Sequence, residues 1–300
     1  MRVERGKGPW PKSNDEASVK LWFISLVKQA VEEDEREPLA RLCLNHASGR
    51  TKGERLMDNY KYPESALDEL SIIADKLSDH NPIQYILGST YFDGLEFKVD
   101  HRVLIPRPET EELVMHVASE LNNGFDGSVL DIGTGSGCIA VSLKHRFTGA
   151  QVYGVDVSQD ALEVALGNAI ENNCKVNFTC CDVLESRPSG DKIFDAVVSN
   201  PPYIPNKEVE SMSQRVHLKE PAVALFVEDS DPLIFYKRII ELCEHGMLKS
   251  GGLLAMECHT DFTSSVEGLL NESEHPWVSV SIVNDLQGLP RHVIARFELS

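Results

Sequence analysis

Long apolar runs are absent from this sequence, and so are the usual signals for membrane insertion or secretion. No run approaches the roughly 18 apolar residues that a membrane-spanning helix needs, so we expect no membrane partner. The opening residues, MRVERGKGPWPKSNDEAS, lack the apolar segment of a secretory signal peptide. Internal repeats and low-complexity tracts are missing as well, which is typical of a globular protein.

Basic residues are scarce. The 29 Lys and Arg residues are outnumbered by 47 Asp and Glu residues, which gives a formal charge of −18. Proteins that hold nucleic acid through its phosphates need clustered Lys and Arg. The charge therefore argues against nucleic acid as the partner.

Cysteines with metal-site spacing are also lacking. There are seven cysteines, an odd number, and no two have the C-x-x-C spacing that is typical of zinc sites. We therefore expect free thiols, no metal, and a reducing compartment inside the cell, either the cytoplasm or the matrix of an organelle. The cysteines are Cys43, Cys138, Cys174, Cys180, Cys181, Cys243 and Cys258.

The chain does contain enough apolar residues, 42% of 300, for one large or two modest domains. Apolar side chains recur at helical spacing from residue 18 to about residue 80, and we expect Pro38 and Pro63 each in the first turn of a helix. These features predict a helical N-terminal domain over residues 1–80. In the linker that follows, residues 81–105, the Asp93-Gly94 pair between two apolar segments predicts a β-hairpin.

Strand-like and helical runs alternate from residue 106 to residue 300. This alternation predicts an α/β domain, a mainly parallel sheet with helices on both faces. The last two strands are expected to form an antiparallel pair. The expected strands are 128–132, 151–155, 178–180, 196–199, 252–257, 278–283 and 292–298, and the expected helices are 138–144, 159–172, 232–245 and 260–271.

Three glycines join a strand to a helix in the segment VLDIGTGSGCIA. Gly133, Gly135 and Gly137 let the backbone turn sharply and approach a ligand, and the helix that follows offers free amides. Asp131 stands before the first glycine, so the loop reads D-x-G-x-G-x-G, whereas a dinucleotide-binding loop reads G-x-G-x-x-G. A carboxylate at this position suits a ligand that has an ammonium group and no pyrophosphate. The loop therefore argues against a nicotinamide cofactor.

Polar side chains end four successive predicted strands. Asp156, about 20 residues beyond the loop, can accept hydrogen bonds from ribose hydroxyls. Asp182 can accept from an adenine amino group, and Asn200 ends the fourth strand. Because the carboxyl ends of parallel strands meet at one edge of a sheet, we expect these groups beside Asp131, and S-adenosylmethionine is the ligand that carries an ammonium, a ribose and an adenine. The predicted cofactor site comprises Asp131, Gly133, Thr134, Gly135, Ser136, Gly137, Asp156, Asp182, Val183 and Asn200.

The segment VVSNPPYIP ends the fourth strand, because proline cannot donate a hydrogen bond to a sheet. Beside a cofactor site, the Asn200 side-chain oxygen can accept one N–H of a planar amino group and the Pro201 carbonyl can accept the other. Such positioning prepares the nitrogen for methyl transfer. Pro202 stiffens the loop and Tyr203 offers a flat wall, so these four residues are the predicted catalytic and substrate-binding group.

The N-P-P-Y motif leaves two other hypotheses open. It fits enzymes that methylate adenine or guanine in nucleic acid, and it could persist in a binding protein that has lost activity. The charge of −18 counts against the first. The intact motif and glycine loop count against the second.

Six segments together resemble the HemK/PrmC protein-glutamine methyltransferases, over about residues 20–298. They are PIQYILG, FDGLEFKVD, VLIPRPETEELV, DIGTGSGCIAVSL, DVSQDALEVALGNA and VVSNPPYIP. VLIPRPETE discriminates best, since nucleic-acid methyltransferases do not generally carry it. The resemblance implies a class I, Rossmann-like enzyme that methylates the glutamine of the GGQ motif in class I peptide-chain release factors, with S-adenosylmethionine as methyl donor.

The resemblance also implies roles for residues outside the glycine loop. Arg107, Pro108, Glu109 and Thr110 would line the mouth of the active site, and the N-terminal helical domain and hairpin would dock the release factor. We expect a monomer. One departure concerns the segment after Glu220-Pro221-Ala222-Val223-Ala224-Leu225: the family usually continues with two glycines, and residues 226–231 here read FVEDSD.

Overall fold

The computed structural model describes residues 6–188, 190–211, 214–275 and 277–298. The chain divides into two compact units. The first consists of the residues up to Leu87 together with Gln214–Lys219, and the second of Gly88–Ser213 and Glu220–Ser300. Within the described residues, no helix is both long and apolar enough to cross a membrane.

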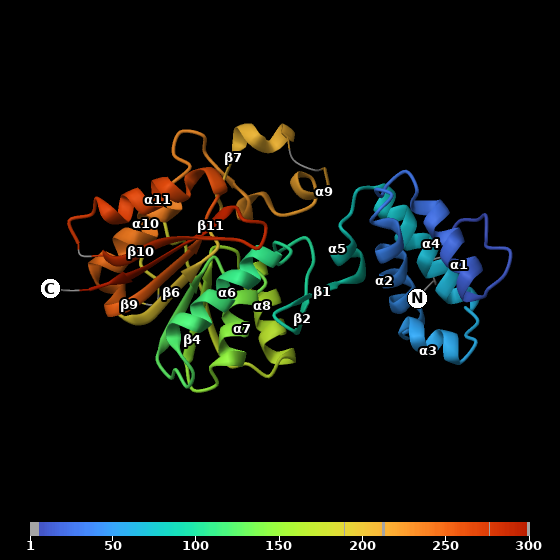
Figure 1. Ribbon diagram of the computed structural model, residues 1–300, viewed down its shortest axis with the longest axis horizontal. Helices are drawn as coiled ribbons and strands as arrows, with labels where there is room; N and C mark the ends of the chain where they lie inside the picture. Colours follow the sequence, from blue (N-terminus) through green and yellow to red (C-terminus); the bar gives the residue numbers. More distant parts are fainter. Residues whose placement is uncertain (1–5, 189, 212–213, 276, 299–300) are drawn as a thin grey trace. The chain divides into compact units, whose positions relative to one another are not determined.

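The first unit is a helical bundle (blue to teal in Figure 1, with α9 in yellow-orange). Apolar stripes on three of its helices meet in a core around Phe23, Leu44 and Leu70, none of which is exposed. The Asp15 carboxylate starts the first helix by accepting from the Ser18 amide at 2.9 Å. The helices are α1 (Glu16–Val27), α2 (Arg36–Ser48), α3 (Lys52–Met57), α4 (Glu64–Ser78), α5 (Ile83–Leu87) and α9 (Gln214–His217).

The interior of this bundle contains a charged residue, Arg55, that is paired with residues from other segments. Arg55 is 1% exposed, and its guanidinium donates to the Glu16 carboxylate at 2.8 Å. The Tyr62 hydroxyl donates to the same carboxylate, also at 2.8 Å. Because a buried charge is costly unless it is paired and hydrogen-bonded, these contacts are what makes the interior position of Arg55 tolerable.

The second unit is built on a seven-stranded sheet of order β10-β11-β9-β6-β3-β4-β5. The five strands from β9 to β5 are parallel, and β11 pairs antiparallel with both β9 and β10. The chain runs outward from β3 to β5 and then returns to the other side of β3 as β6, so the order reverses between β3 and β6. The strands are β3 (Ser128–Ile132), β4 (Gln151–Asp156), β5 (Val176–Cys180), β6 (Phe194–Ser199), β9 (Leu248–Glu257), β10 (Trp277–Asn284) and β11 (Pro290–Phe297).

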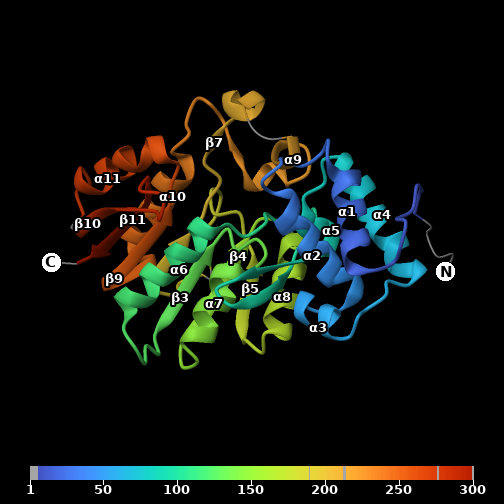
Figure 2. The same ribbon diagram turned by 45° about the vertical axis from the view of Figure 1, so that its right-hand side comes forward.

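Helices cover both faces of this sheet, with α6, α7 and α8 on one face and α10 and α11 on the other (Figures 1 and 2). Side chains alternate between the faces along each strand: Val129 packs on the first core and Leu130 on the second. The helices are α6 (Pro108–Leu121), α7 (Cys138–Arg146), α8 (Gln159–Glu171), α10 (Ile234–Leu242) and α11 (Thr263–Asn271), with short helical turns η1 (Asn206–Ser211), η2 (Ala222–Ala224), η3 (Cys243–Met247) and η4 (Thr260–Phe262).

Two small two-stranded sheets complete the second unit. β1 (Ser89–Phe92) and β2 (Leu95–Lys98) form the hairpin, whose Phe92 and Phe97 belong to the core that α6, α7 and α8 cover, and the Lys98 amide of β2 donates to Asn168 of α8. β7 (Ile204–Pro205) pairs in parallel with β8 (Phe226–Val227), so the segment without the family's glycines is joined to the strand that follows N-P-P-Y.

The sequence predicted most of these elements. The mainly parallel sheet with helices on both faces, the hairpin at Asp93-Gly94 and the antiparallel final pair are confirmed. Pro38 lies in the first turn of α2, as expected, because that helix begins at Arg36, whereas Pro63 is the N-cap of α4 and precedes its first turn. Helices α3 and α6 were not predicted, although Pro108 at the first position of α6, followed by acidic residues, is a typical helix start.

Candidate active site

The glycine loop joins β3 to α7 and is fixed to the neighbouring strand. The amides of Gly133 and Thr134 both donate to the Val155 carbonyl at 2.9 Å, which holds the loop against the end of β4. Gly133, Gly135 and Gly137 all have positive φ, at +72°, +53° and +81°. Residues with a side chain rarely adopt this conformation, so the loop requires glycine at these positions.

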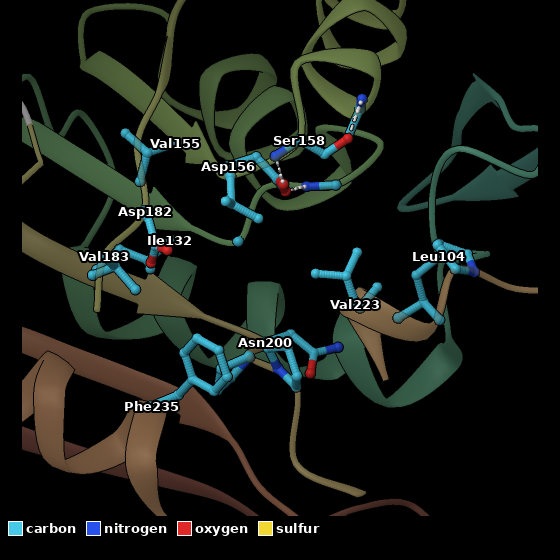
Figure 3. Close-up of a pocket in the computed structure, with 18 of the residues that line it drawn as sticks. Leu104, Ile132, Val155, Asp156, Ser158, Asp182, Val183, Asn200, Val223 and Phe235 are labelled. Atoms are coloured by element: carbon cyan, nitrogen blue, oxygen red, sulfur yellow. Dashed lines mark hydrogen bonds between the residues drawn. The ribbon is translucent and has the colours of Figure 1, made fainter. Parts of the chain in front are cut away.

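A cavity of about 260 Å³ opens beside this loop, at the carboxyl ends of β3, β4, β5 and β6. It lies at the point where the strand order reverses, which is where open α/β sheets bind their ligands. Figure 3 shows Asp156 on one side of the cavity and Asn200 and Phe235 on the other. The predicted site residues in its lining are Gly133, Gly135, Asp156, Asp182, Val183, Asn200, Pro201 and Pro202.

Asp156 is held rigidly at the end of β4. Its Oδ2 accepts from the Gly135 amide at 2.9 Å, and its Oδ1 accepts from the Ser158 amide at 2.9 Å (dashed in Figure 3). Burial raises the pKa of this carboxyl, and the two amides oppose that rise. Each oxygen keeps a lone pair, so the carboxylate can accept further hydrogen bonds from a ligand.

The far end of the cavity is mostly apolar. Val183 and Leu184 follow β5, and Phe235 comes from α10 on the other side. The Asp182 carboxylate accepts from the Leu184 amide at 2.9 Å, which fixes the turn after β5. This end offers apolar walls with one carboxylate, a composition that suits a flat heterocycle with an amino group.

Asp131 is placed differently from the other strand-end residues. It is fully buried behind the glycine loop and is not part of the cavity lining. Its Oδ2 accepts from the Thr134 hydroxyl at 2.6 Å and from the Ala140 amide at 3.2 Å, while its buried Oδ1 has no hydrogen-bond partner among the described residues. Burial raises the pKa of this carboxyl to about 7. Its contact with a cofactor ammonium stays a prediction.

The remaining loop residues, Thr134, Ser136 and Gly137, make contacts that stabilise the fold. Thr134 and Ser136 are buried, and the Ser136 carbonyl accepts from the side-chain Nδ2 of Asn168 at 2.9 Å. A Cβ on Gly137 would lie 3.1 Å from the Ala165 Cβ, so this glycine lets α7 pack closely on α8.

We expect Gly137→Ala to lower the free energy of unfolding by about 1–3 kcal/mol, because an alanine at positive φ is strained and would also crowd Ala165. Gly167→Ala is the matched control: Gly167 lies in α8 with open space around it. That substitution should raise stability by about 0.5–1 kcal/mol. Urea denaturation measures both, and changes of the same sign would contradict the account.

The N-P-P-Y segment carries a chain of hydrogen bonds that leads away from the cavity. Asn200 Nδ2 donates to Thr110 Oγ1 at 3.0 Å, and Thr110 Oγ1 donates to Glu257 Oε2 at 2.7 Å. The Tyr203 hydroxyl donates to the other oxygen of Glu257, at 3.3 Å. Burial and the nearby carboxylate raise the pKa of Tyr203, and burial raises that of Glu257 to about 7. Tyr203 is not part of the cavity lining.

None of the four residues expected at the mouth of the site is in the lining either; they are Arg107, Pro108, Glu109 and Thr110. The Arg107 guanidinium donates to the Glu220 carboxylate, which is 5% exposed and also accepts from the Ile105 amide at 3.2 Å. The Glu109 carbonyl accepts from His292 Nε2 at 2.9 Å. Their roles toward a substrate stay predictions.

Sequence reasoning missed three contributors to the site. Glu257 ends the parallel strand β9, so the rule that selected Asp131, Asp156, Asp182 and Asn200 would have found it. Phe235 and Val223 line the cavity from segments distant in the chain. Phe235 gives no signal in one sequence, because an aromatic residue in a helix is equally typical of an ordinary core. Val223 lies in the Glu220–Leu225 segment that belongs to the resemblance, but that segment was not assigned to the cavity.

Sequence comparisons relate this chain to known methyltransferases. The family model described as Methyltransferase small domain matches residues 110–226. A release factor glutamine methyltransferase of Chlorobaculum tepidum is 37% identical over 293 residues, which cover 91% of this chain and 96% of the relative. Its counterpart in Flavobacterium psychrophilum is 42% identical over 199 residues, which cover 64% and 70%.

Solved structures share the fold at low identity. The hMettl16 catalytic domain, solved in complex with the MAT2A 3′UTR hairpin 1, gives a TM-score of 0.55 at 20% identity over 78% of this chain and 82% of that one. A methyltransferase of Pyrococcus furiosus gives 0.50 at 18% identity over 68% and 89%. The mainly parallel sheet with helices on both faces is the fold that these methyltransferases share. The chain is an enzyme of the release factor glutamine methyltransferase family.

Proposed function

We propose that this protein transfers a methyl group from S-adenosylmethionine to the side-chain amide nitrogen of the glutamine in the GGQ motif of class I peptide-chain release factors. The observation that carries the proposal is the placement of Asn200 and Pro201 in the same cavity as Asp156 and the glycine loop. A site for an amide substrate therefore adjoins a site for a ribose-containing ligand. The relatives that are named for this activity support the same assignment.

The residues present fit S-adenosylmethionine. Two ribose hydroxyls would donate to the Asp156 carboxylate and offset the burial that raises its pKa. Val183 and Phe235 would pack against the adenine, with Asp182 beside its amino group. When bound, the cofactor supplies an electrophilic methyl group on a sulfonium.

The protein's own contribution is to hold and polarise the acceptor nitrogen. A carboxamide nitrogen is a weak nucleophile because its lone pair is delocalised. Asn200 Oδ1 would accept one of its N–H groups and the Pro201 carbonyl the other, which orients the nitrogen and draws its electrons toward the methyl group. The methylated nitrogen loses its extra proton readily, so no residue has to remove a proton beforehand.

The helical first unit is proposed to dock the release factor. Every residue that lines the cavity belongs to the second unit, so the helical unit takes no direct part in binding the cofactor. The seven free thiols support action in a reducing compartment, the cytoplasm or an organelle matrix.

Methyl transfer from labelled S-adenosylmethionine tests the substrate. The purified protein is incubated with an unmethylated class I release factor, with the same factor carrying Gln→Ala in its GGQ motif, and with ribosomal RNA and DNA. We expect label in the first sample alone. Label in nucleic acid, with none in the release factor, would overturn the proposal in favour of an amino-methyltransferase for adenine or guanine.

A further inference from the structure

We propose that Thr110 and Glu257 are positioning residues that fix the orientation of the Asn200 amide, so that its oxygen and not its nitrogen is presented to the substrate. The inference rests on the proposed function, since it concerns how the same site holds an amide.

The two ends of the Asn200 side chain have nearly the same shape and opposite chemistry. The oxygen only accepts hydrogen bonds and the NH₂ only donates. A substrate amide nitrogen presents donors, so a flipped Asn200 would place donor against donor. Shape alone does not exclude the flip, and a specific contact has to select one orientation.

The contacts of Thr110 make that selection. Its Oγ1 lies 2.7 Å from Glu257 Oε2 and 3.0 Å from Asn200 Nδ2. A hydroxyl has one proton, and a carboxylate can only accept, so the Thr110 proton points to Glu257. The oxygen of Thr110 is then an acceptor toward Asn200, and only the NH₂ end of Asn200 can face it. The Asn200 oxygen is left for the substrate.

Burial prevents other arrangements of the hydrogen bonds that link Asn200, Thr110 and Glu257. Thr110 is 3% exposed and Glu257 is 1% exposed, so water cannot replace either partner. The backbone of Glu257 is fixed in β9 opposite His292 of β11, and its carbonyl accepts from the Tyr236 hydroxyl of α10 at 3.2 Å. An unpaired polar group in such a place costs about 1–3 kcal/mol, which penalises any other arrangement.

The charge of Glu257 sets the direction of the whole chain. Burial, with Glu109 on α6, opposes its charged form and raises the pKa to about 7, while the Thr110 hydroxyl, Arg291 on β11 and the Tyr203 hydroxyl favour that form. His292 lies beside it in neutral form, because burial lowers its pKa to about 4. A protonated Glu257 would donate a hydrogen bond to the Thr110 oxygen. The Thr110 proton would then point to Asn200, and only the flipped Asn200 amide, with its oxygen toward Thr110, could accept it.

Four variants test this positioning. Thr110→Val removes the hydroxyl at nearly constant shape, Thr110→Ser keeps it, and Glu257→Gln removes the titrating charge while keeping an acceptor. Thr263→Val is the matched control, because Thr263 is equally buried, at 2%, and donates only to the Thr260 carbonyl in another part of the second unit. The measurements are kcat and KM for the release factor from pH 6 to pH 9, and the cofactor Kd by calorimetry.

We expect Thr110→Val to lower kcat by about 10- to 100-fold with the cofactor Kd changed by less than about twofold. Thr110→Ser should recover most of the loss, and Thr263→Val should leave kcat unchanged. In the wild type, kcat should rise with pH through about 7 as Glu257 ionises, and Glu257→Gln should remove that rise.

A Thr110→Val enzyme with wild-type kcat would overturn the positioning role, as would equal losses in Thr110→Val and Thr110→Ser or an unchanged pH profile in Glu257→Gln. These outcomes leave the proposed function standing, because the wild type still methylates the release factor in the same assay. No methylation by the wild type would overturn the proposed function and the positioning role that rests on it.

Discussion

Asn200→Ala should lower kcat by about 100- to 1,000-fold, because it removes the acceptor that we propose to orient the reacting nitrogen. The cofactor Kd should change by less than about twofold, since the Asp156 carboxylate and the glycine loop stay in place. Single-turnover kinetics with a release factor and calorimetry with the cofactor give the two quantities separately.

Asn177→Ala controls for the loss of an asparagine as such. Asn177 is exposed on β5, outside the cavity lining, and its one side-chain contact is a long hydrogen bond of 3.4 Å to the Val152 carbonyl. This variant should behave as wild type. Equal losses of kcat and of cofactor affinity in Asn200→Ala would show that Asn200 binds the cofactor and does not orient the substrate.

Asp156→Ala should weaken cofactor binding more than it lowers kcat, the reverse of what we expect for Asn200→Ala. We expect the cofactor Kd to rise by at least about 100-fold, because two ribose hydroxyls would lose a charged acceptor and such hydrogen bonds are worth about 1.5–3 kcal/mol each. The Gly135 and Ser158 amides also lose their acceptor, which loosens the loop that faces the ligand. Calorimetric titration with S-adenosylmethionine measures the change.

The matched control for Asp156→Ala is Asp160→Ala. Asp160 lies in the first turn of α8 and is exposed, so its removal changes the net charge by the same amount without touching the cavity. Its Kd should stay at the wild-type value. An Asp156→Ala enzyme that binds the cofactor as well as Asp160→Ala would remove Asp156 from the site.

Strand ends were predictable because they follow from a rule about sheets. Apolar runs locate the parallel strands, and the residue after each run must lie at the shared carboxyl edge. Asp156, Asp182 and Asn200 do line one cavity there. Asp131 lies within β3 and not after it, and the alternation of side chains puts it on the same face as Val129, where it accepts from Thr134 and from the Ala140 amide of α7.

Contacts between distant segments could not be predicted in this way. Glu220 binds Arg107 from more than 100 positions away, and Phe235 reaches the cavity from α10. Arg55 looks like a surface residue in a polar stretch, and only the packed bundle shows it buried against Glu16. Such pairs depend on how elements pack, which one sequence without relatives does not encode in a local pattern.

The most direct test of the account is to locate the methyl group. Tandem mass spectrometry of a release factor incubated with the protein and S-adenosylmethionine identifies the modified atom. The account predicts one methyl group on the side-chain nitrogen of the GGQ glutamine, and almost none when Asn200→Ala replaces the wild type under the same conditions. A methyl group on any other residue, or an equal yield with Asn200→Ala, would contradict it.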